Sequence, residues 1–415
     1  MNAPRPSDPG HRQYAAACLA TLAGFAGLGP RRLSWLLALH PPAEALEVLR
    51  GRSRPADALR AAWSGDLWET LRSQARHCDP ASVYRTCTDR GIEVVGRDDS
   101  RYPDQLRCDP VPPAVLFMRG DPSLVTARRV GIVGTRNPTR AGLDTAASLG
   151  RQLGRAGVVV VSGLAKGIDG AAHRGVLEVD GRPIGVVANG LDRPYPAVHR
   201  RLWDEVAERG LLVSEWPPGS APEAYRFPLR NRLIAALSEI VVVVESRERG
   251  GSLSTVREAA RRDVQVMAVP GSPMIRASRG TNQLLCDGAA PVTGVQDVLV
   301  ALGLDTRRSA GLIHDARPRP DGVAAEIIEW CRAMPRTLDD LIAEFTGAGT
   351  GLAPRSVGEV ALVLARLERD GWLVESGGWF QVVGAFAGVA TPRDTGEYPV
   401  APCGHDSDRS PESPS

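Results

Sequence analysis

The chain has 415 residues, of which 43% are hydrophobic and 24% charged, and this composition excludes an intrinsically disordered or collagen-like protein. Its net charge of only +2 excludes a protein that coats nucleic acid through bulk positive charge. The seven cysteines contain no C-x-x-C pair, and no apolar run is long enough to span a membrane. We therefore expect a cytoplasmic protein with reduced thiols, no metal site and no membrane contact.

Residues 14–80 are predicted to form a small helical domain of the SAM or helix-hairpin-helix kind. Apolar residues at helical spacing precede and follow a Gly27-Leu28-Gly29-Pro30 turn, and Pro30 suits the first turn of a helix. A glycine turn between two short helices can present backbone N–H groups to a DNA phosphate. We favour a docking role for this domain over a DNA-binding one.

Residues 83–304 are predicted to form a Rossmann-like α/β domain. Short β-branched runs alternate with helical stretches, at residues 130–133, 158–161, 184–188, 211–213, 240–244 and 264–269. Strands that are apolar on both faces are typical of a parallel sheet covered by helices on both sides. The predicted fold class is therefore α/β.

A Pro/Arg-rich linker at residues 305–321 leads to a predicted winged-helix domain at residues 322–384. Helical patterns near 322–333, 337–345 and 355–369 precede alternating residues around Gly377-Gly378, which predict a hairpin. Residues 385–415 contain little that could be buried, so we expect a disordered tail.

The charge is divided unevenly between the two predicted folded domains. Residues 128–294 carry 23 basic and 16 acidic side chains, whereas residues 323–384 carry 5 basic and 9 acidic ones. A winged helix that binds DNA should be basic, because neutralisation of phosphates dominates its affinity. We expect this acidic winged helix to contact a protein partner and not to bind DNA on its own.

The first candidate site follows the strand at 130–133, where the sequence runs Gly131-Ile-Val-Gly134-Thr135-Arg136. Glycine lets the backbone approach a phosphate, the following helix N-terminus donates N–H groups, and Arg136 adds a guanidinium fork. The motif is neither G-x-G-x-x-G nor a Walker A loop, so it does not favour a dinucleotide or a nucleoside triphosphate. A purely structural turn is an equal alternative.

The second candidate site follows the strand at 158–161. Ser162, Gly163 and Lys166 lie in another glycine loop, and Lys166 is the only lysine of the chain. Open α/β sheets bind ligands at such strand ends. Asp169 is placed to cap the next helix, and His173, one turn later, could pair with it. For His173 we favour a role in helix packing over a catalytic or metal-binding one.

Two further loops contain the third and fourth candidate sites. Phe227-Pro-Leu-Arg230-Asn231-Arg232 enters a helix predicted at 229–238, and its charges could follow phosphates while the ring stacks on a base. The equal alternative is a loop-to-helix turn with Phe227 in the core. Gly251 and Ser252 lie in a Gly/Ser loop after the strand at 240–244. Four such loops on one sheet edge exceed what one small ligand requires.

Taken together, these motifs resemble the DNA-processing protein A family (DprA, also called Smf) over residues 85–295. The resemblance rests on GIVGTR at 131–136, SGLAKGID with AAH at 162–173, NGLDRPYP at 189–196, SEWPPG at 214–219, FPLRNR at 227–232 and GGSLSTVREA at 250–259. The chain departs from the family pattern at His199, where Asn is frequent, and at Gly250, where Ser is frequent.

The resemblance implies a non-enzymatic protein without a cofactor that forms a homodimer, binds single-stranded DNA and helps to load the RecA recombinase in natural transformation and homologous recombination. The residues that would contact DNA are Gly134, Thr135, Arg136, Ser162, Gly163, Lys166, Phe227, Arg230, Asn231, Arg232, Gly251 and Ser252.

Two alternatives remain open. Gly250–Thr255 with Glu258 is similar to the loop of nucleotide phosphoribohydrolases that resemble lysine decarboxylases, in which a glutamate assists cleavage of the base–sugar bond. The proline-flanked double glycine of those enzymes is missing here, and no convergent pair of acids is visible. The other alternative is a structural dimerisation scaffold with vestigial loops.

Overall fold

The computed structural model describes residues 9–304, 320–346, 356–376 and 378–382. The chain divides into two compact units, residues 1–308 and residues 309–415, and each is described by itself. Within the described ranges, no helix is both long enough and apolar enough to cross a membrane. The predicted tail at 385–415 and most of the predicted linker at 305–321 lie outside the described residues.

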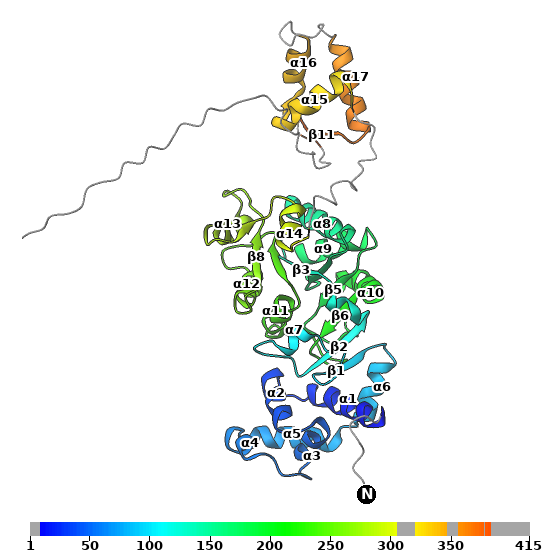
Figure 1. Cartoon of the computed structure of the whole chain (residues 1–415), viewed down its shortest axis with the longest axis vertical. Helices are drawn as coiled ribbons and strands as arrows, with labels where there is room; N and C mark the ends of the chain where they lie inside the picture. Colours follow the sequence, from blue (N-terminus) through cyan, green and yellow to red (C-terminus); the bar gives the residue numbers. More distant parts are fainter. Residues whose placement is uncertain (1–8, 305–319, 347–355, 377, 383–415) are drawn as a thin grey trace, which may run out of the picture. The chain divides into compact units, whose positions relative to one another are not determined.

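The first unit begins with a group of short helices (Figure 1). Their bounds are α1 Pro9–Ala23, α2 Pro30–Leu39, α3 Pro42–Leu49, α4 Asp57–Ala62, α5 Gly65–His77 and α6 Pro80–Thr88. Proline is the first residue of α1, α2, α3 and α6, where a backbone N–H would have no partner within the helix. Gly27 adopts φ 86 in the turn between α1 and α2, a conformation that glycine takes without strain.

A nine-stranded sheet forms the centre of the first unit. Its strands, in the order β1-β2-β6-β5-β4-β3-β7-β8-β9, are β1 Glu93–Gly96, β2 Val115–Gly120, β6 Leu211–Ser214, β5 Pro183–Val186, β4 Val159–Ser162, β3 Arg129–Val133, β7 Ile240–Val243, β8 Gln265–Ala268 and β9 Ala290–Pro291. The strands from β6 to β9 pair in parallel, which confirms the predicted parallel α/β sheet. β1 and β2, which the sequence analysis missed, pair antiparallel at one edge.

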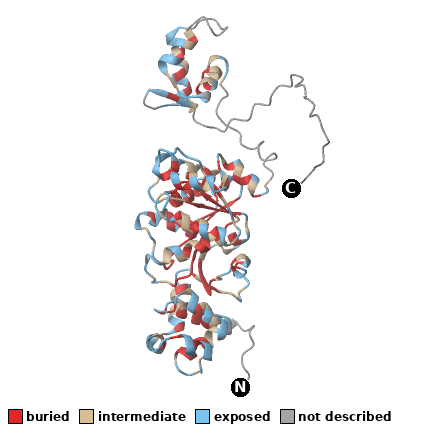
Figure 2. Ribbon diagram, turned by 90° about the vertical axis from the view of Figure 1, so that its left-hand side faces the viewer, coloured by how far each residue is buried: buried red, intermediate tan, exposed pale blue. Residues whose placement is uncertain are grey.

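Helices cover both faces of the sheet, and the strands are buried between them (Figure 2). Val159 and Val161 of β4 pack in one core cluster with residues of α11 (Arg226–Ala236) and α12 (Ser252–Ala260). Val160 points the other way and packs with residues of α8 (Arg140–Arg155), α9 (Ile168–Leu177) and α14 (Val295–Ala301). This alternation with a period of two is why the strands read as continuous apolar runs. The remaining helices of the unit are α7 Asp104–Arg107, α10 Arg200–Arg209 and α13 Arg279–Cys286.

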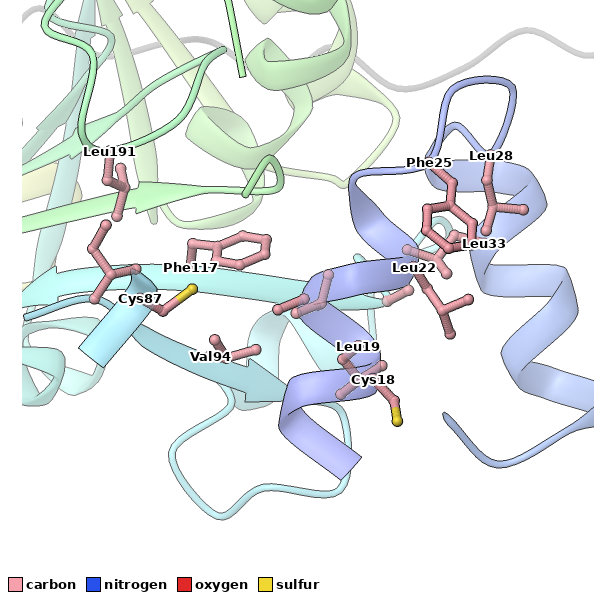
Figure 3. Close-up of a cluster of buried hydrophobic side chains, with 14 of the residues drawn as sticks. Cys18, Leu19, Leu22, Phe25, Leu28, Leu33, Cys87, Val94, Phe117 and Leu191 are labelled. Carbon is pink, nitrogen blue, oxygen red and sulfur yellow. The ribbon is translucent and has the colours of Figure 1, made fainter. Parts of the chain in front are cut away.

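The N-terminal helices share one hydrophobic core with an edge of the sheet. Leu19 and Leu22 of α1 belong to the same buried cluster as Phe117 of β2 and Leu191 in the loop after β5. Figure 3 labels these side chains, with Leu19 and Leu22 on α1 and Phe117 on a strand beside it. The predicted break between residues 80 and 83 therefore falls inside a continuous core.

The second unit contains helices α15 Gly322–Ala333, α16 Leu338–Thr346 and α17 Val357–Arg369. A three-stranded antiparallel sheet in the order β10-β12-β11 accompanies them, with β10 at Arg336–Thr337, β11 at Leu373–Ser376 and β12 at Trp379–Val382. Each predicted helix and the predicted hairpin are present at close to the expected residues, and they enclose one small apolar core. These are the elements expected of a winged helix.

Candidate nucleic-acid interface

The loops that carry the sequence motifs meet at the carboxyl edge of the parallel strands. The chain runs from β3 through β4 and β5 to β6 on one side, and β7 then returns to the other side of β3. Open α/β sheets bind ligands at such a switch point. The loops after β3 and β7 are joined across it, because the Thr135 N–H donates to the Glu245 carbonyl over 2.8 Å.

Three side chains from three different segments form a partly exposed stack at this edge. The guanidinium carbon of Arg136, in the loop after β3, lies 5.0 Å from the centroid of the Phe227 ring in the first turn of α11. The Phe227 and Tyr195 ring centroids are 5.7 Å apart with an interplanar angle of 51°. Arg136 and Tyr195 are exposed and Phe227 is half-buried, so Phe227 does not belong to the core. We call these three side chains the aromatic–cation stack.

Several cations, Arg136 of the stack among them, lie in the loops of this edge. Arg136, Lys166, Arg193, Arg247 and Arg249 are exposed and form no ion pair with any residue that the structure describes. The nearby acidic side chains are engaged instead: Asp192 pairs with Arg90 at 2.5 Å and Glu248 with Arg279 at 3.7 Å. The edge therefore presents uncompensated positive charge, which favours an anionic ligand.

The N-terminus of α8 is already occupied by a protein carboxylate. Glu245 accepts hydrogen bonds from the Thr139 N–H at 2.9 Å and from the Thr139 hydroxyl at 2.5 Å. A Cβ at Gly142 would lie 2.4 Å from the Glu245 carboxyl carbon, so the carboxyl group lies directly against the helix. A buried carboxylate thus lies at this helix end, where its negative charge opposes the binding of a phosphate.

The loop after β4 also forms hydrogen bonds within the protein. Gly167, with φ 82, is the N-cap of α9, and Asp169 is therefore not the cap that its position suggested. The Asp169 carboxylate accepts the Gly163 N–H at 3.1 Å, which takes that donor away from any phosphate. Burial raises the pKa of Asp169. Only Lys166 at the tip of this loop is exposed.

Two serines predicted to contact DNA are buried. The Ser162 hydroxyl donates to the Ile132 carbonyl at 2.5 Å, and the Ser252 hydroxyl donates to Ser246 Oγ at 2.9 Å. Ser162 therefore joins the ends of β4 and β3, and Ser252 joins the start of α12 to the loop after β7. Their hydroxyls are therefore not available to a phosphate, and a contact of these residues with DNA stays a prediction.

Two arginines predicted to contact DNA are buried as well. Arg230 donates to the Val186 carbonyl at 2.9 Å, and a Cβ at Gly163 would lie 1.6 Å from its Nη1. Burial lowers the pKa of Arg230 to about 10. Arg232 pairs with Glu215 at 2.5 Å, and both side chains are more than nine-tenths buried. These arginines fix α11, and with it Phe227, and they do not reach the surface.

The remaining predicted residues fall into two groups. Gly251 is exposed with open space around it, and Asn231, Gly134 and Thr135 are half-buried. A Cβ at Gly134 would lie 2.5 Å from the Ile168 side chain, so this glycine is required by close packing. Tyr195, Arg193, Arg247 and Arg249 were not predicted as site residues, although NGLDRPYP and the loop after β7 contain them.

His173 is a buried packing residue. It is fully buried, neither ring nitrogen has a hydrogen-bond partner in the described part of the chain, and the predicted pair with Asp169 is not formed. Burial lowers its pKa to about 3. His199 lies nearby and shares a 3.0 Å hydrogen bond with the Leu164 carbonyl through Nδ1. Among the described residues, no three His, Cys, Asp or Glu side chains gather in a way that could hold a metal ion.

Comparison with known proteins agrees with the motifs. The sequence model of the family described as DNA recombination-mediator protein A matches residues 93–303. The DNA processing protein DprA of Bacillus subtilis is 40% identical over 215 residues, which are 52% of this chain and 72% of that protein.

Solved structures are also similar. The crystal structure of DNA processing protein A from Streptococcus pneumoniae is 30% identical with a TM-score of 0.58, and the match covers 69% of this chain and 97% of that one. A structure of DNA processing protein A from Helicobacter pylori, solved to describe how that protein binds single-stranded DNA, is 30% identical with a TM-score of 0.46. That match covers 52% of this chain and 96% of that one.

Proposed function

This chain belongs to the DNA recombination-mediator protein A family, and from that premise we propose that it binds single-stranded DNA along the carboxyl edge of its sheet. The proposed role is DNA processing in natural transformation and homologous recombination. In that role the protein would protect incoming single strands and help to load the RecA recombinase on them. The protein is proposed to act as a homodimer and without a cofactor.

The observation that carries the proposal is the aromatic–cation stack of Arg136, Phe227 and Tyr195. A single strand differs from a duplex because its bases are free to stack on side chains, and each stacked base contributes about 1–3 kcal/mol. A guanidinium beside the rings can pair with the phosphate that links two stacked bases. A small anion would use the charge but not the two rings.

The surrounding cations support a long, polyanionic ligand. Lys166, Arg193 and Arg247 come from three different loops of the same edge and have no acidic partner among the described residues. Neutralising a row of phosphates releases counterions, which makes the affinity depend steeply on salt. A spread of free cations over several loops fits a strand better than one compact ligand.

The enzyme alternative is less well supported. Glu258, the candidate catalytic glutamate, pairs with Arg261 at 2.7 Å and with Arg262 at 2.6 Å. Glu245, the other acid near the Gly/Ser loop, caps α8. Both carboxylates are thus held in structural contacts, and we propose a binding protein that does no chemistry on the DNA.

The acidic winged helix is proposed to contact protein. In the second unit, Leu362 of α17 is 74% exposed, and Trp379 of β12 is 47% exposed. Exposed apolar side chains on an acidic surface suit a protein partner better than DNA, whose phosphates the acidic groups would repel. The isolated fragment 322–384 should therefore not bind DNA at moderate salt.

The proposal is tested by measuring the affinity of the full chain for labelled single-stranded and duplex oligonucleotides of the same sequence, together with hydrolysis of AMP. We expect tighter, salt-sensitive binding of the single strand and no release of free base. Hydrolysis of the nucleotide with no affinity for the single strand would favour the enzyme alternative.

A further inference from the structure

His199 joins two loops of the carboxyl edge that are distant in the sequence. It is the last residue of the 3₁₀ turn Ala197–His199, which follows the loop that carries Tyr195. Its side chain is buried, and Nδ1 lies 3.0 Å from the Leu164 carbonyl oxygen in the loop after β4. A carbonyl oxygen only accepts hydrogen bonds, so Nδ1 carries the proton and donates it to this bond.

The imidazole ring of His199 lies in a niche that a glycine leaves open on α9. A Cβ at Gly170 would lie 2.5 Å from His199 Cε1 and 3.0 Å from Nε2, which is closer than side chains tolerate. Burial lowers the pKa of His199, and the charges of Arg174 and Lys166 act in the same direction, so the ring is neutral near pH 7. The ring is therefore a neutral donor that is seated in one position.

The carbonyl group that His199 holds belongs to a residue with a strained backbone. Leu164 is buried and has φ 53, a left-handed conformation that residues with a side chain rarely adopt. Strain of this kind persists only where the surroundings hold it in place. The Gly163 N–H before it is bonded to Asp169 of the adjoining helix at 3.1 Å. The bond from His199, by contrast, comes from another loop.

Lys166, the exposed cation of this loop, lies between two fixed points. On one side is Leu164, which His199 holds. On the other side is Gly167, whose Cβ, if present, would lie 2.4 Å from the Thr135 carbonyl oxygen and 3.0 Å from the Arg136 carbonyl carbon. The segment that carries Lys166 is therefore packed against the loop that carries Arg136 of the aromatic–cation stack.

His199 also fixes the backbone next to another member of the stack. Its N–H donates to the Pro196 carbonyl at 2.9 Å. Pro194 and Pro196 stand on the two sides of Tyr195 and restrict the backbone there. The Tyr195 ring contacts Phe227. One buried residue thus connects the loop of Lys166 with the loop of Tyr195.

We propose that His199 is a positioning residue for single-strand binding, which holds Lys166 at a fixed place relative to the aromatic–cation stack. The cation then meets a phosphate of the same strand whose bases lie on the rings. The inference rests on the proposed function. A site that is organised before the ligand arrives loses less conformational freedom on binding. Loss of the hydrogen bond should therefore weaken binding although His199 itself touches no DNA.

The test measures the affinity of the full chain for oligothymidine by fluorescence anisotropy at several salt concentrations. Lys166→Met should reduce the salt slope by about 0.7, which corresponds to about fivefold weaker binding at roughly 0.1 M salt. His199→Leu removes the donor, and we expect a similar loss and a similar reduction of the slope. The double variant should bind no more than about twofold more weakly than either single one, because both changes remove the same contact.

Two further variants separate positioning from a general effect on folding. His199→Asn should keep the affinity within a factor of about two, because the amide Nδ2 of asparagine takes the place of the imidazole Nδ1 and donates in the same way. His40→Leu is the matched control. His40 is also a buried histidine that is hydrogen-bonded to the backbone, at the Ala56 N–H, but it belongs to the N-terminal helices. It should leave the affinity and the salt slope unchanged.

Gly170→Ala displaces the ring without replacing His199, and it serves as the second variant if His199→Leu does not fold. Alanine favours a helix, so α9 should persist. We expect about fivefold weaker binding from Gly170→Ala alone, because Lys166 loses its phosphate. Combined with His199→Asn, whose side chain has no Cε1 or Nε2, the same change should have almost no effect. Gly65→Ala, at a helical position with open space, is the control.

Native affinity and salt slope in His199→Leu or in Gly170→Ala would overturn the positioning role and leave the proposed function intact. Losses of Lys166→Met and His199→Leu that multiply in the double variant would also overturn it, because His199 would then act elsewhere. An equal loss in His199→Asn and His199→Leu would contradict the role of the donor. Failure of the native chain to bind oligothymidine would overturn the proposed function and this inference with it.

Discussion

The guanidinium carbon of Arg136, in the loop after β3, lies 5.0 Å from the centroid of the Phe227 ring in the first turn of α11, although three strands separate the two residues in the sequence. The contact exists because α11 crosses from β6 to β7 and brings its first turn beside the loop after β3. One charged and one aromatic group are thereby placed where a strand can use both. Substitutions can separate the two contributions.

Replacing Arg136 by alanine should weaken single-strand binding about tenfold for all sequences alike, because a phosphate contact carries no base information. The slope of log K against log salt should fall by about 0.7, the contribution of one phosphate on a single strand. Titrations at several salt concentrations measure both effects. The control is Arg140→Ala, which removes an exposed arginine that already pairs with Asp144 at 3.1 Å. A loss confined to some sequences would contradict the phosphate role.

Phe227→Ala should weaken binding by about 1–3 kcal/mol, because the half-buried ring is expected to stack on a base. The salt slope should stay unchanged, since no charge is removed. Phe227→Trp keeps a stacking surface and should retain most of the affinity. Equal losses in both variants, or a reduced salt slope in Phe227→Ala, would argue against stacking.

Arg232→Met should lower the free energy of unfolding by about 3–5 kcal/mol, because it leaves Glu215 buried without its ionic partner. Chemical denaturation measures this change. Affinity of the folded variant for oligothymidine should stay within a factor of about two, since Arg232 does not reach the surface. The double variant Glu215→Leu with Arg232→Met should recover much of the stability. A large loss of affinity without a loss of stability would restore Arg232 as a DNA contact.

The burial of His173 should make the protein sensitive to acid. The pKa of His173 falls from 6.5 to about 3 on folding. Below pH 6.5 His173 is therefore protonated in the unfolded chain but stays neutral in the folded protein. The contribution of neutral His173 to the free energy of unfolding is therefore fully present above pH 6.5 and is lost as the pH falls towards 3. The loss amounts to about 2 kcal/mol at pH 5.

His173→Leu checks this prediction by denaturation at a series of pH values. The variant should be about as stable as the native chain near pH 7, because neither ring nitrogen has a partner to lose, and its stability should fall less between pH 6.5 and 5. His77→Gln, at an exposed position, is the control for replacing a histidine. The same acid slope in His173→Leu would mean that another group is responsible.

The parallel part of the sheet was predictable because its strands are buried on both faces and therefore read as short apolar runs. β1 and β2 were missed, since Glu93–Gly96 contains only two apolar side chains and Val115–Gly120 ends in Arg119 and Gly120. Only β1 is an edge strand, and a short antiparallel edge strand with two apolar side chains lacks the pattern of a buried parallel strand. β2 lies between β1 and β6, and its Val115–Met118 is a buried apolar run like those of the parallel strands.

The site was predictable in its loops but not in the direction of its side chains. Arg230 and Arg232 stand beside Phe227 in the sequence, yet the former turns towards the Val186 carbonyl and the latter towards Glu215. Sequence spacing does not distinguish an arginine that pairs with a buried acid from an exposed arginine that can bind a phosphate. The acid that caps α8, Glu245, comes from a distant strand end and gives no local signal.

The central claim is that the aromatic–cation stack contacts the bases of a single strand, and photo-crosslinking tests it most directly. The full chain is irradiated with a thymidine oligomer that carries 5-iododeoxyuridine, and the attached peptides are identified by mass spectrometry. We predict crosslinks at Phe227 or Tyr195, and their loss in the Phe227→Ala variant. Crosslinks found only in residues 322–382, or unchanged by Phe227→Ala, would contradict the account.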